Sequence, residues 1–410
     1  MRHRVMVVGS IGMMVFAVMG LLCSSAGRAA EKEFVWAHID DFSGPYAAST
    51  EENFRSMTMF LEERGYKIGP FKVKVVTRDT ELKPATGVRR LQEVIAEYNP
   101  LIVSSGEGSP IHIAMLDVIK KAKGPIFWTD AWDTSITGQN GNRYSFRWDT
   151  PISAQFEAVL NGFLKLFPET KKGMNIQIDH AAGYDATRTI EGVFKERGIQ
   201  LLKNQFIPPT ATDISVFVNE AKASGADVYI VGLYGKIFGT GLMQCKEFGL
   251  SKTMKVLSAT GSIFTLRGVG SDIIQGMYFG DHWNHSISNE WSRNYTEKYR
   301  KRWGVIPGAK GAAKYAECQL MERVITQTGS TDPKVLIPAL ENLGEFDGPT
   351  GKEYISPWQH QVIHDFLVLR GKAPSEKKYE DDYVEVIGKY RVSPKQGDKG
   401  FEFDRTKDPL

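Results

Sequence analysis

The sequence predicts an α/β protein built from two open, mostly parallel sheets flanked by helices. Three observations support this fold class. Short apolar runs alternate with amphipathic stretches that are long enough to be helices. The apolar runs end in glycine, serine, aspartate and other small or polar residues, as strands of a parallel sheet often do. This rhythm pauses near Asp149 and restarts at Ala154, which predicts two units of ordinary domain size.

The chain begins with a pattern typical of an export signal. Arg2 and Arg4 precede an almost uninterrupted apolar run over residues 5–22, and Gly27-Arg28-Ala29 supplies the small residues of a cleavage site. A membrane span is the alternative, although the run is near the lower length limit. A lipoprotein signal at Cys23 would need a smaller residue before it. We expect residues 1–29 to be a signal peptide and the remaining chain to be periplasmic.

The composition after residue 29 gives no support for nucleic acid or anionic lipid as a partner. Residues 1–29 carry three arginines and no acidic residue, so the formal net charge of +3 falls to zero without them. A neutral chain gives no general reason to expect nucleic acid or anionic lipid as a partner. Cys245 and Cys318 lie far apart without metal-type spacing, and the sequence leaves open whether they pair or remain buried thiols.

The first unit is predicted to alternate strands with helices. The run over 71–76 alternates apolar and lysine side chains, which is typical of a strand, whereas Leu91, Val94 and Ile95 share one face of a helix. The expected strands are 34–39, 71–76, 101–105, 125–128 and 144–149, and the expected helices are 50–64, 84–98 and 111–120.

The second unit repeats the alternation. Its expected strands are 174–178, 201–207, 227–231, 255–258 and 277–280, and its expected helices are 154–167, 186–197, 214–224 and 238–248. Two further helices are predicted over 288–303 and 311–328. We expect the chain after about Arg370 to be irregular, with the charged residues 372–382 forming a solvated loop.

The stretch from Leu101 to Lys120 predicts a strand, a glycine-rich turn and the start of a helix. Backbone N–H groups and the positive end of a helix dipole favour an anion at such a turn, and Ser105 and Ser109 can add hydroxyl donors. The alternative is a plain connection that uses glycine for its geometry. A glycine-rich turn alone is a weak motif.

Several motifs occur in an order that resembles a known family. They are the segment Phe42-Ser43-Gly44-Pro45-Tyr46, the Ser104–Pro110 turn, Asp179 followed by Gly183-Tyr184, and Gly232-Leu233-Tyr234. With the signal peptide, this order resembles the leucine/isoleucine/valine-binding family of periplasmic substrate-binding proteins that serve ABC importers. The resemblance covers roughly residues 34–369. It rests on order and spacing, because no single motif is diagnostic.

The resemblance implies a type I periplasmic-binding fold, with two lobes joined by three crossing hinge segments. These would fall near Asp149-Thr150-Pro151, Asp281-His282-Trp283 and Ser356-Pro357-Trp358. Lobe one would be 31–149 plus 284–355, and lobe two 150–283 plus 356–410. The family also implies a monomer without a cofactor, with a small-molecule ligand, an inner-membrane ABC permease and its ATPase as partners.

The resemblance also implies which residues bind the ligand. The matching residues are Glu107, Gly108 and Ser109 for a carboxylate, Ala131 and Trp132 at the next strand end, Asp149 at the first crossing, and Tyr184, Tyr234 and Lys236 in lobe two. Two positions depart from the family. Trp132 cannot supply the usual hydroxyl, although its indole can stack or donate one N–H. Lys236 stands where an acid normally pairs with the ligand ammonium.

These departures predict a ligand other than a branched-chain amino acid. Lys236 would repel an ammonium and attract a second anionic group, unless it points into solvent. Aromatic residues also fall at predicted strand ends or crossings, either as core packing or as flat walls of a cleft: Trp128, Trp132, Trp148, Tyr184, Tyr234 and Trp283. We expect an aromatic or otherwise unsaturated carboxylate, or a small amide.

Two other functions compete with transport. A periplasmic sensor that reports to a receptor would share the fold. A secreted hydrolase is the rival from another class, but the chain has no G-x-S-x-G elbow and no phosphate-binding loop. His282 with His285, and His360 with His364, offer only two metal ligands each, and nothing brings Asp179-His180 to Ser104 or Ser105 as a triad. We therefore expect a binding protein and no enzyme.

Overall fold

The computed structural model describes residues 32–106, 108–393 and 402–410. The predicted signal peptide lies outside these ranges. Within them, every helix falls short of the length or apolar character that a membrane crossing requires.

The first sheet has six strands, and five of them run parallel. The strand order is β2-β3-β1-β4-β5-β6, and only the short β2 pairs antiparallel. The strands are β1 Glu33–Asp40, β2 Lys67–Ile68, β3 Phe71–Asp79, β4 Ile102–Ser105, β5 Ile126–Thr129 and β6 Ser145–Arg147. The near-continuous burial of β1, β4, β5 and β6 is typical of a parallel sheet that is covered by helices, whereas β3 near the edge alternates between buried and exposed residues.

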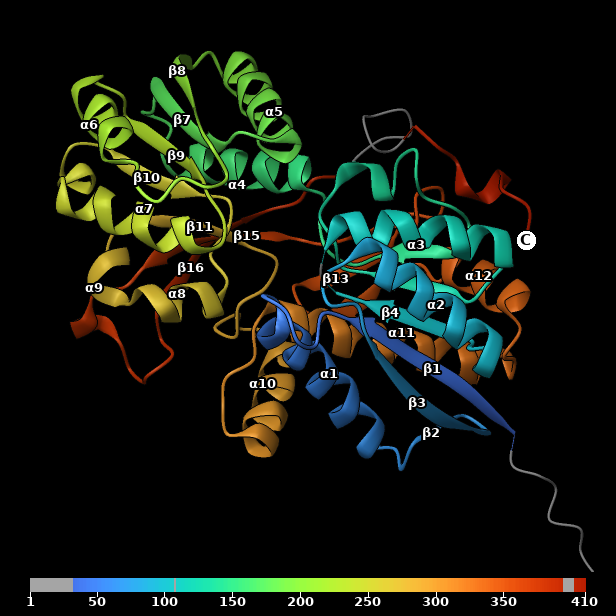
Figure 1. Ribbon diagram of the computed structural model, residues 1–410. Coiled ribbons are helices and arrows are strands. Elements are labelled where there is room, and N and C mark those ends of the chain that lie inside the picture. The colour runs from blue at the N-terminus through green and yellow to red at the C-terminus, as the bar shows by residue number, and fades with distance from the viewer. Residues whose placement is uncertain (1–31, 107, 394–401) are drawn as a thin grey trace, which may run out of the picture. The chain divides into compact units, whose positions relative to one another are not determined.

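Helices from two distant parts of the sequence pack in this lobe. They are α1 Ala47–Glu62, α2 Pro84–Tyr98, α3 Ser109–Ala122, α10 Glu290–Trp303, α11 Ala309–Thr328 and α12 Pro333–Glu341. Helix α11 packs against α1 and α12, so the orange helices lie beside the blue strands in Figure 1. Residues 309–341 therefore complete a core that residues 33–147 begin.

The second sheet has seven strands in the order β16-β15-β11-β10-β9-β7-β8. The strands are β7 Lys172–Ile178, β8 Gln200–Ile207, β9 Val228–Gly232, β10 Lys255–Ser258, β11 Tyr278–Asp281, β15 Phe366–Gly371 and β16 Val384–Tyr390. The first five are mutually parallel, whereas β15 and β16 add antiparallel strands at one edge. The expectation of an irregular chain after Arg370 was wrong for β16.

The helices of the second lobe come from one continuous stretch. They are α4 Ile152–Leu166, α5 Ala181–Arg197, α6 Ser215–Ala223, α7 Lys236–Glu247, α8 Ile263–Val269 and α9 Ser271–Ile274. The mostly parallel sheets and their helices confirm the predicted fold class. The exact lobe boundaries stay a prediction.

Three segments carry the chain between the two sheets. Residues 148–151 join β6 to α4, and residues 282–289 join β11 to α10. The third crossing comes later than predicted. Residues Ser356–His360 form a turn, after which β14 (Val362–Ile363) pairs back onto β13 (Gly351–Ile355), itself paired with β12 (Phe346–Gly348). The chain therefore passes to the second sheet at His364 and Asp365, just before β15.

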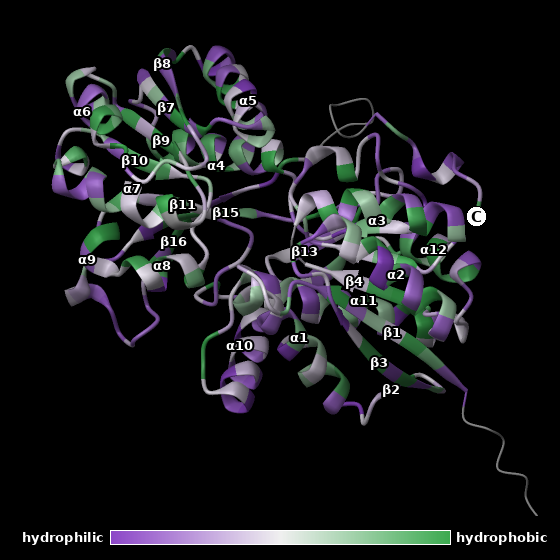
Figure 2. Ribbon diagram, viewed as in Figure 1, coloured by the Kyte–Doolittle hydropathy of each residue, from purple (hydrophilic) through white to green (hydrophobic). Residues whose placement is uncertain are grey.

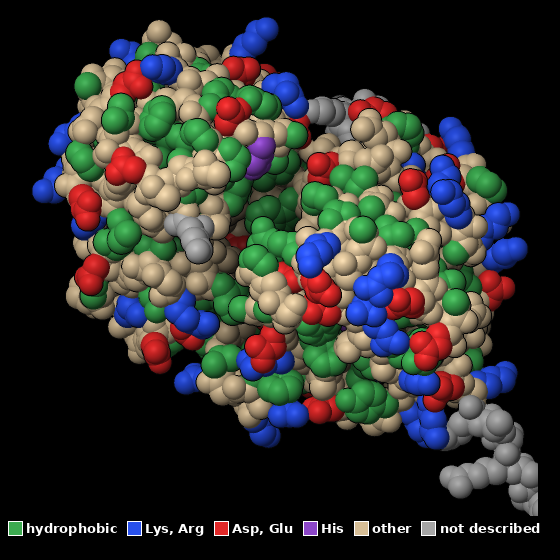
Figure 3. Space-filling model, in the orientation of Figure 1, with side chains coloured by type: hydrophobic (Ala, Val, Ile, Leu, Met, Phe, Trp, Pro, Cys, Tyr) green, Lys and Arg blue, Asp and Glu red, His purple; other side chains and the backbone are tan. Residues whose placement is uncertain are grey.

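The interior is divided between the lobes. One core cluster surrounds the first sheet and two surround the second. Cys318 lies in the first core and Cys245 in a core of the second lobe, and both are buried free thiols. Figure 2 shows mostly hydrophobic central strands and a largely hydrophilic α10. Charges of both signs are interspersed over the face shown in Figure 3, as the neutral balance predicts.

Residues 402–410 return to the first lobe. The Arg405 side chain donates to the backbone carbonyls of Thr137 and Gly138, and Leu410 packs against the first core. The Arg405 amide donates to the Trp358 carbonyl at 2.8 Å. This segment therefore supports the loop that contains the short helix η1 (Thr134–Ile136).

Candidate ligand-binding site

Polar side chains gather at the carboxyl ends of four strands in the first sheet. Strands β1, β4, β5 and β6 lie side by side and run parallel. Because they point the same way, the segments that follow them meet at one edge of the sheet. The segments with predicted ligand residues, 106–109, 130–133 and 149–151, all follow these strands.

The glycine-rich turn has fewer free backbone donors than its sequence suggests. The Gly106 amide donates to Asp40 Oδ2 at 2.8 Å. Pro110 has no N–H, and the amides of residues 111 and 112 donate to the Gly108 carbonyl at 2.8 and 3.2 Å. Gly108 begins helix α3 with a φ of 88°, a conformation that favours glycine. The anion site stays a prediction, with several of its donors already engaged.

The turn is tied to the next loop through Ser109. Its hydroxyl oxygen accepts the Asp133 amide at 3.2 Å. Glu107, which the resemblance assigns to the ligand carboxylate, lies outside the described residues. The structure thus places Gly108 and Ser109 at the expected edge of the sheet and says nothing of Glu107.

Arg147 holds the loop over residues 130–133 from inside the protein. Its Nη1 donates to the carbonyls of Ala131 (3.3 Å) and Asp133 (2.6 Å), and its Nε donates to Gln361 Oε1 (2.7 Å). Complete burial lowers the pKa of Arg147 to about 9, which still leaves the guanidinium charged at neutral pH. The Ala131 carbonyl therefore has a partner already, and its contact with a ligand stays a prediction.

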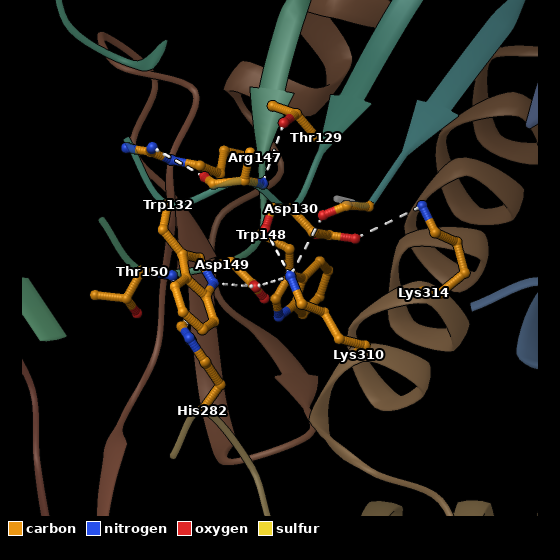
Figure 4. A network of polar contacts seen from close by, with 12 residues as sticks. Thr129, Asp130, Trp132, Arg147, Trp148, Asp149, Thr150, His282, Lys310 and Lys314 are labelled. Atoms are coloured by element: carbon orange, nitrogen blue, oxygen red, sulfur yellow. Dashed lines mark hydrogen bonds and ion pairs between the residues drawn. The ribbon is translucent and has the colours of Figure 1, made fainter. Parts of the chain in front are cut away.

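Asp149 is the centre of the polar network drawn in Figure 4. Its Oδ2 accepts the Lys310 ammonium at 2.6 Å and the Trp132 indole N–H at 2.9 Å. The same ammonium donates to the backbone carbonyls of Asp130 (2.7 Å) and Gly106 (3.4 Å). It also lies 5.4 Å from the centre of the Trp132 ring, within the range of a cation–π contact.

The charge on Asp149 depends on this lysine. Burial is the largest single effect and raises the pKa of this carboxyl group, but the Lys310 charge, His282 and the hydrogen bonds from Lys310 and Trp132 together outweigh burial and lower the pKa to about 2. Oδ1 of Asp149 is buried and accepts no hydrogen bond from the described residues. The carboxylate is thus ionised and neutralised inside the protein.

A second lysine lies one turn further along α11. Lys314 is completely buried, lies 3.8 Å from Asp130 Oδ2 and hydrogen-bonds Glu317. Burial raises the pKa of Asp130 well above its ordinary value, and repulsion from Asp149 adds to this despite the attraction of Lys314. Helix α11 therefore brings two cations to the strand ends of the first sheet.

Histidines connect the crossing segments. The Thr150 amide donates to His282 Nδ1 at 3.3 Å, and the Thr150 hydroxyl contacts His364 Nε2 at 3.2 Å. Burial lowers the pKa of His282 to about 3, so its ring is neutral near neutral pH. The ring stacks beside Trp132 at 6.2 Å. Among the described residues, no group of three or more His, Cys, Asp or Glu side chains is placed to hold a metal.

The second lobe brings its predicted residues to its own strand ends. The Tyr234 ring stacks on His180 at 6.0 Å, and its buried hydroxyl has no hydrogen-bond partner among the described residues. Tyr184 is 43% exposed, and its hydroxyl donates to Asp179. Lys236 is the first residue of α7. Its side chain lies outside the described part of the structure, so whether it faces a ligand stays a prediction.

Only part of the predicted aromatic set is accessible. Trp128, Trp148 and Trp283 are at most 2% exposed and belong to the first core, so they pack the lobe and form no wall of a binding site. Trp132 is half-buried and Tyr184 is exposed. The structure thus leaves Trp132 as the accessible tryptophan at the strand ends of the first sheet.

Sequence reasoning missed Lys310, Lys314 and His282 as members of the site. His282 was assigned to a crossing and was considered with His285 as an incomplete pair of metal ligands. The two lysines are four residues apart in a stretch rich in alanine and glycine, and lysine within such a buried helix is uncommon. That pattern is the one signal in the sequence that could have identified them.

Comparisons with known proteins agree with this architecture. Residues 37–378 match the sequence profile of a family described as periplasmic binding protein. A "Leu/Ile/Val-binding protein homolog 6" from Brucella suis is 23% identical over 403 residues, which cover 96% of this chain and 99% of the relative.

Solved structures show the same fold. An amino acid ABC transporter substrate-binding protein from Pseudomonas fluorescens Pf-5 has a TM-score of 0.84 at 28% identity, covering 90% of this chain and 99% of the other. An ABC transporter solute-binding protein from Rhodopseudomonas palustris BisB5 was solved with 3,4-dihydroxybenzoic acid. It has a TM-score of 0.76 at 19% identity, and the match covers 88% of this chain and 98% of the other. The profile match covers most of the chain, so this protein belongs to the periplasmic binding protein family and has its type I fold.

Proposed function

We propose that this protein is the solute-binding component of an ABC importer and that it captures a small carboxylate or amide with a flat, unsaturated group. It would work in the periplasm as a monomer, carry out no chemistry, and deliver its ligand to a membrane permease driven by an ATPase. Membership of the periplasmic binding protein family supports the binding role. The similarity to the amino acid ABC transporter substrate-binding protein from Pseudomonas fluorescens supports the role in a transporter.

The observation that carries the choice of ligand is the setting of Trp132. Its half-buried indole lies beside the neutral His282 ring and within 5.4 Å of the Lys310 ammonium. A flat indole surface suits an aromatic ligand, because the two rings can stack. Lys310 is already paired with Asp149, so the ligand carboxylate would be held by the turn at Gly108 and Ser109 or by Lys236. The dihydroxybenzoic acid bound by the Rhodopseudomonas palustris protein belongs to this class.

Both lobes would contribute to capture. Lobe one would hold the ligand through Glu107, Gly108, Ser109, Ala131 and Trp132, with Asp149 behind them. Lobe two would add Tyr184, Tyr234 and Lys236. Contacts to both lobes would shift an equilibrium between open and closed forms, and the closed form would dock on the permease.

The test is a binding panel on the protein without residues 1–29. Native mass spectrometry first identifies any co-purified small molecule. Isothermal titration then compares benzoate, 4-hydroxybenzoate, 3,4-dihydroxybenzoate, benzamide, phenylalanine and leucine. We expect at least one aromatic acid or amide to bind more tightly than leucine. Tight binding of leucine without binding of any aromatic compound would contradict the proposed ligand class. Hydrolysis of compounds in a panel of esters and amides would instead favour the function of a hydrolase.

A matched pair of variants locates the site. Trp132→Leu should weaken the binding of the preferred ligand about tenfold, since stacking contributes roughly 0.5–1.5 kcal/mol beyond the area buried. Trp303→Leu alters a tryptophan at the end of α10 and should leave affinity unchanged. Equal effects of the two substitutions would place the ligand elsewhere.

A further inference from the structure

The Lys310 ammonium lies among several hydrogen-bond acceptors. Those among the described residues include Asp149 Oδ2 at 2.6 Å, the Asp130 carbonyl at 2.7 Å and the Gly106 carbonyl at 3.4 Å. An ammonium has three N–H donors and no acceptor, so a group of acceptors of this kind suits it. The side chain is 13% exposed, whereas the Asp149 side chain is 1% exposed.

This set of groups has the chemistry of a receptor for a primary ammonium. It combines one carboxylate, two backbone carbonyls and the face of an indole ring, and each of them attracts a cation. The receptor is built by the strand ends of the first sheet, whereas the ammonium comes from the first turn of α11. The protein fills its own ammonium position with a residue from a distant part of the chain.

A ligand ammonium cannot share this position. Any amine that approached Asp149 would be repelled by the like charge of Lys310. Displacing Lys310 would break a buried ion pair, which is unfavourable. A ligand that carries a carboxylate without an amine avoids both costs. Lys310 thereby separates two ligand classes that share the same acid group.

We propose that Lys310 is a specificity-determining residue, which occupies the ammonium position of the first lobe and restricts the site to carboxylates or amides without a primary amine. This inference rests on the proposed function for one premise, which is that the ligand binds at this edge of the first sheet. The existence of the ammonium receptor can be tested without any ligand.

The first experiment is chemical rescue of Lys310→Ala. The substitution removes three methylene groups and the ammonium, and propylammonium can refill that space. We expect propylammonium chloride to raise the Tm of this variant by about 3 °C in a saturable way, as a bound ligand does. Propan-1-ol and potassium chloride at matched concentration should have no such effect. The native protein and the Lys310→Ala/Asp149→Asn double variant should not respond.

The rescue is decisive in either direction. The proposed ammonium receptor would be contradicted if the native protein, Lys310→Ala and the double variant all responded equally. It would also be contradicted if a folded Lys310→Ala variant did not respond. If Lys310→Ala does not fold, Lys310→Met keeps most of the side-chain volume without the charge and is carried into the second experiment.

The second experiment uses two ligands that differ only by an amine, 3-phenylpropanoate and phenylalanine. We expect the native protein to prefer 3-phenylpropanoate by at least tenfold, and Lys310→Met to reduce this ratio at least tenfold. An unchanged ratio, or native preference for phenylalanine, would overturn the inference. If the native protein binds neither compound nor the wider panel, the proposed function fails while the rescue result still decides the receptor.

Discussion

The pKa of Asp149 results from burial opposed by its polar neighbours. Burial raises the pKa most strongly, yet Lys310, His282 and the hydrogen bonds together bring the value to about 2. The ionised carboxylate therefore stabilises the folded chain only while it remains charged. The stability of the protein in acid should therefore depend in part on this residue.

We predict that Asp149→Asn makes stability less sensitive to acid. The folded pKa of about 2 lies below the ordinary value of 3.8, so the stabilisation is present above about pH 4 and is lost as the pH falls toward 2. This shift corresponds to about 2–3 kcal/mol. Urea unfolding between about pH 5 and pH 2 should show the free energy of unfolding of the native protein falling by that amount relative to the variant.

Asp117 provides the control at the same scale, because it is an exposed aspartate on α3. Asp117→Asn should follow the native pH dependence. If Asp149→Asn follows it as well, Asp149 is not held in an ion pair in solution.

Individual residues show where sequence reasoning reaches its limit. The resemblance placed Trp132 and Asp149 at the ligand site, and the structure brings their side chains into contact at the strand ends of one sheet. Lys310 was not predicted, because no local pattern says that an ammonium from α11 reaches Asp149. Trp128 and Trp148 were grouped with Trp132, but a position near a strand end does not reveal whether a side chain faces the core.

At the scale of elements, the long alternating strands and helices were predictable and the short antiparallel pieces were not. Periodicity identifies β3 and α2, whose patterns extend over many residues. Strand β14 has two residues and exists only because β13 offers it a partner. Strand β16 is surrounded by charged residues and is fixed by pairing with β15. Such strands depend on tertiary pairing, so the third crossing was placed too early.

Helix α5 carries two glycines with opposite constraints. A Cβ at Gly183 would lie 2.0 Å from the Ile178 carbonyl oxygen, whereas a Cβ at Gly192 meets no atom within 4 Å. Only the first glycine is therefore required by the close approach of β7. Because Gly183 precedes Tyr184, the same contact positions the aromatic side chain that lobe two is predicted to use.

We predict opposite effects of alanine at these two positions. Gly183→Ala should lower the free energy of unfolding by about 1–3 kcal/mol, because the start of the helix must move away from β7. Gly192→Ala should raise it by about 0.5–1 kcal/mol, because alanine favours the helix more than glycine does. Thermal and urea unfolding of both variants measures the difference. A destabilised Gly192→Ala would contradict the prediction, because the loss at Gly183→Ala could then not be assigned to its contact with Ile178.

For the whole molecule, the proposed mechanism requires that one ligand contacts both lobes. The residues assigned to it come from strand ends of two separate sheets, each with its own core. Binding that orders only one lobe would not shift an equilibrium between open and closed forms. Amide hydrogen exchange can separate these cases, because it reports local opening along the entire chain.

We predict that a saturating ligand slows hydrogen exchange in two distant parts of the sequence at once. The affected segments should be 130–133 in the first lobe and 180–184 with 233–236 in the second. The amides of α6, which carries none of the residues assigned to the ligand, serve as the internal control. Protection confined to one lobe would contradict capture by both.

The support of loop 130–142 by residues 402–410 links ligand binding to the order of synthesis. Ribosomes make the strands of the first sheet early, but the guanidinium that caps the carbonyls of Thr137 and Gly138 belongs to residue 405. Lys310 and Lys314 also arrive long after Asp130 and Asp149. Unfinished chains consequently lack the groups that neutralise and brace this edge of the sheet. We therefore expect chains that stop before Lys310 or before Arg405 to lack this arrangement of the candidate site.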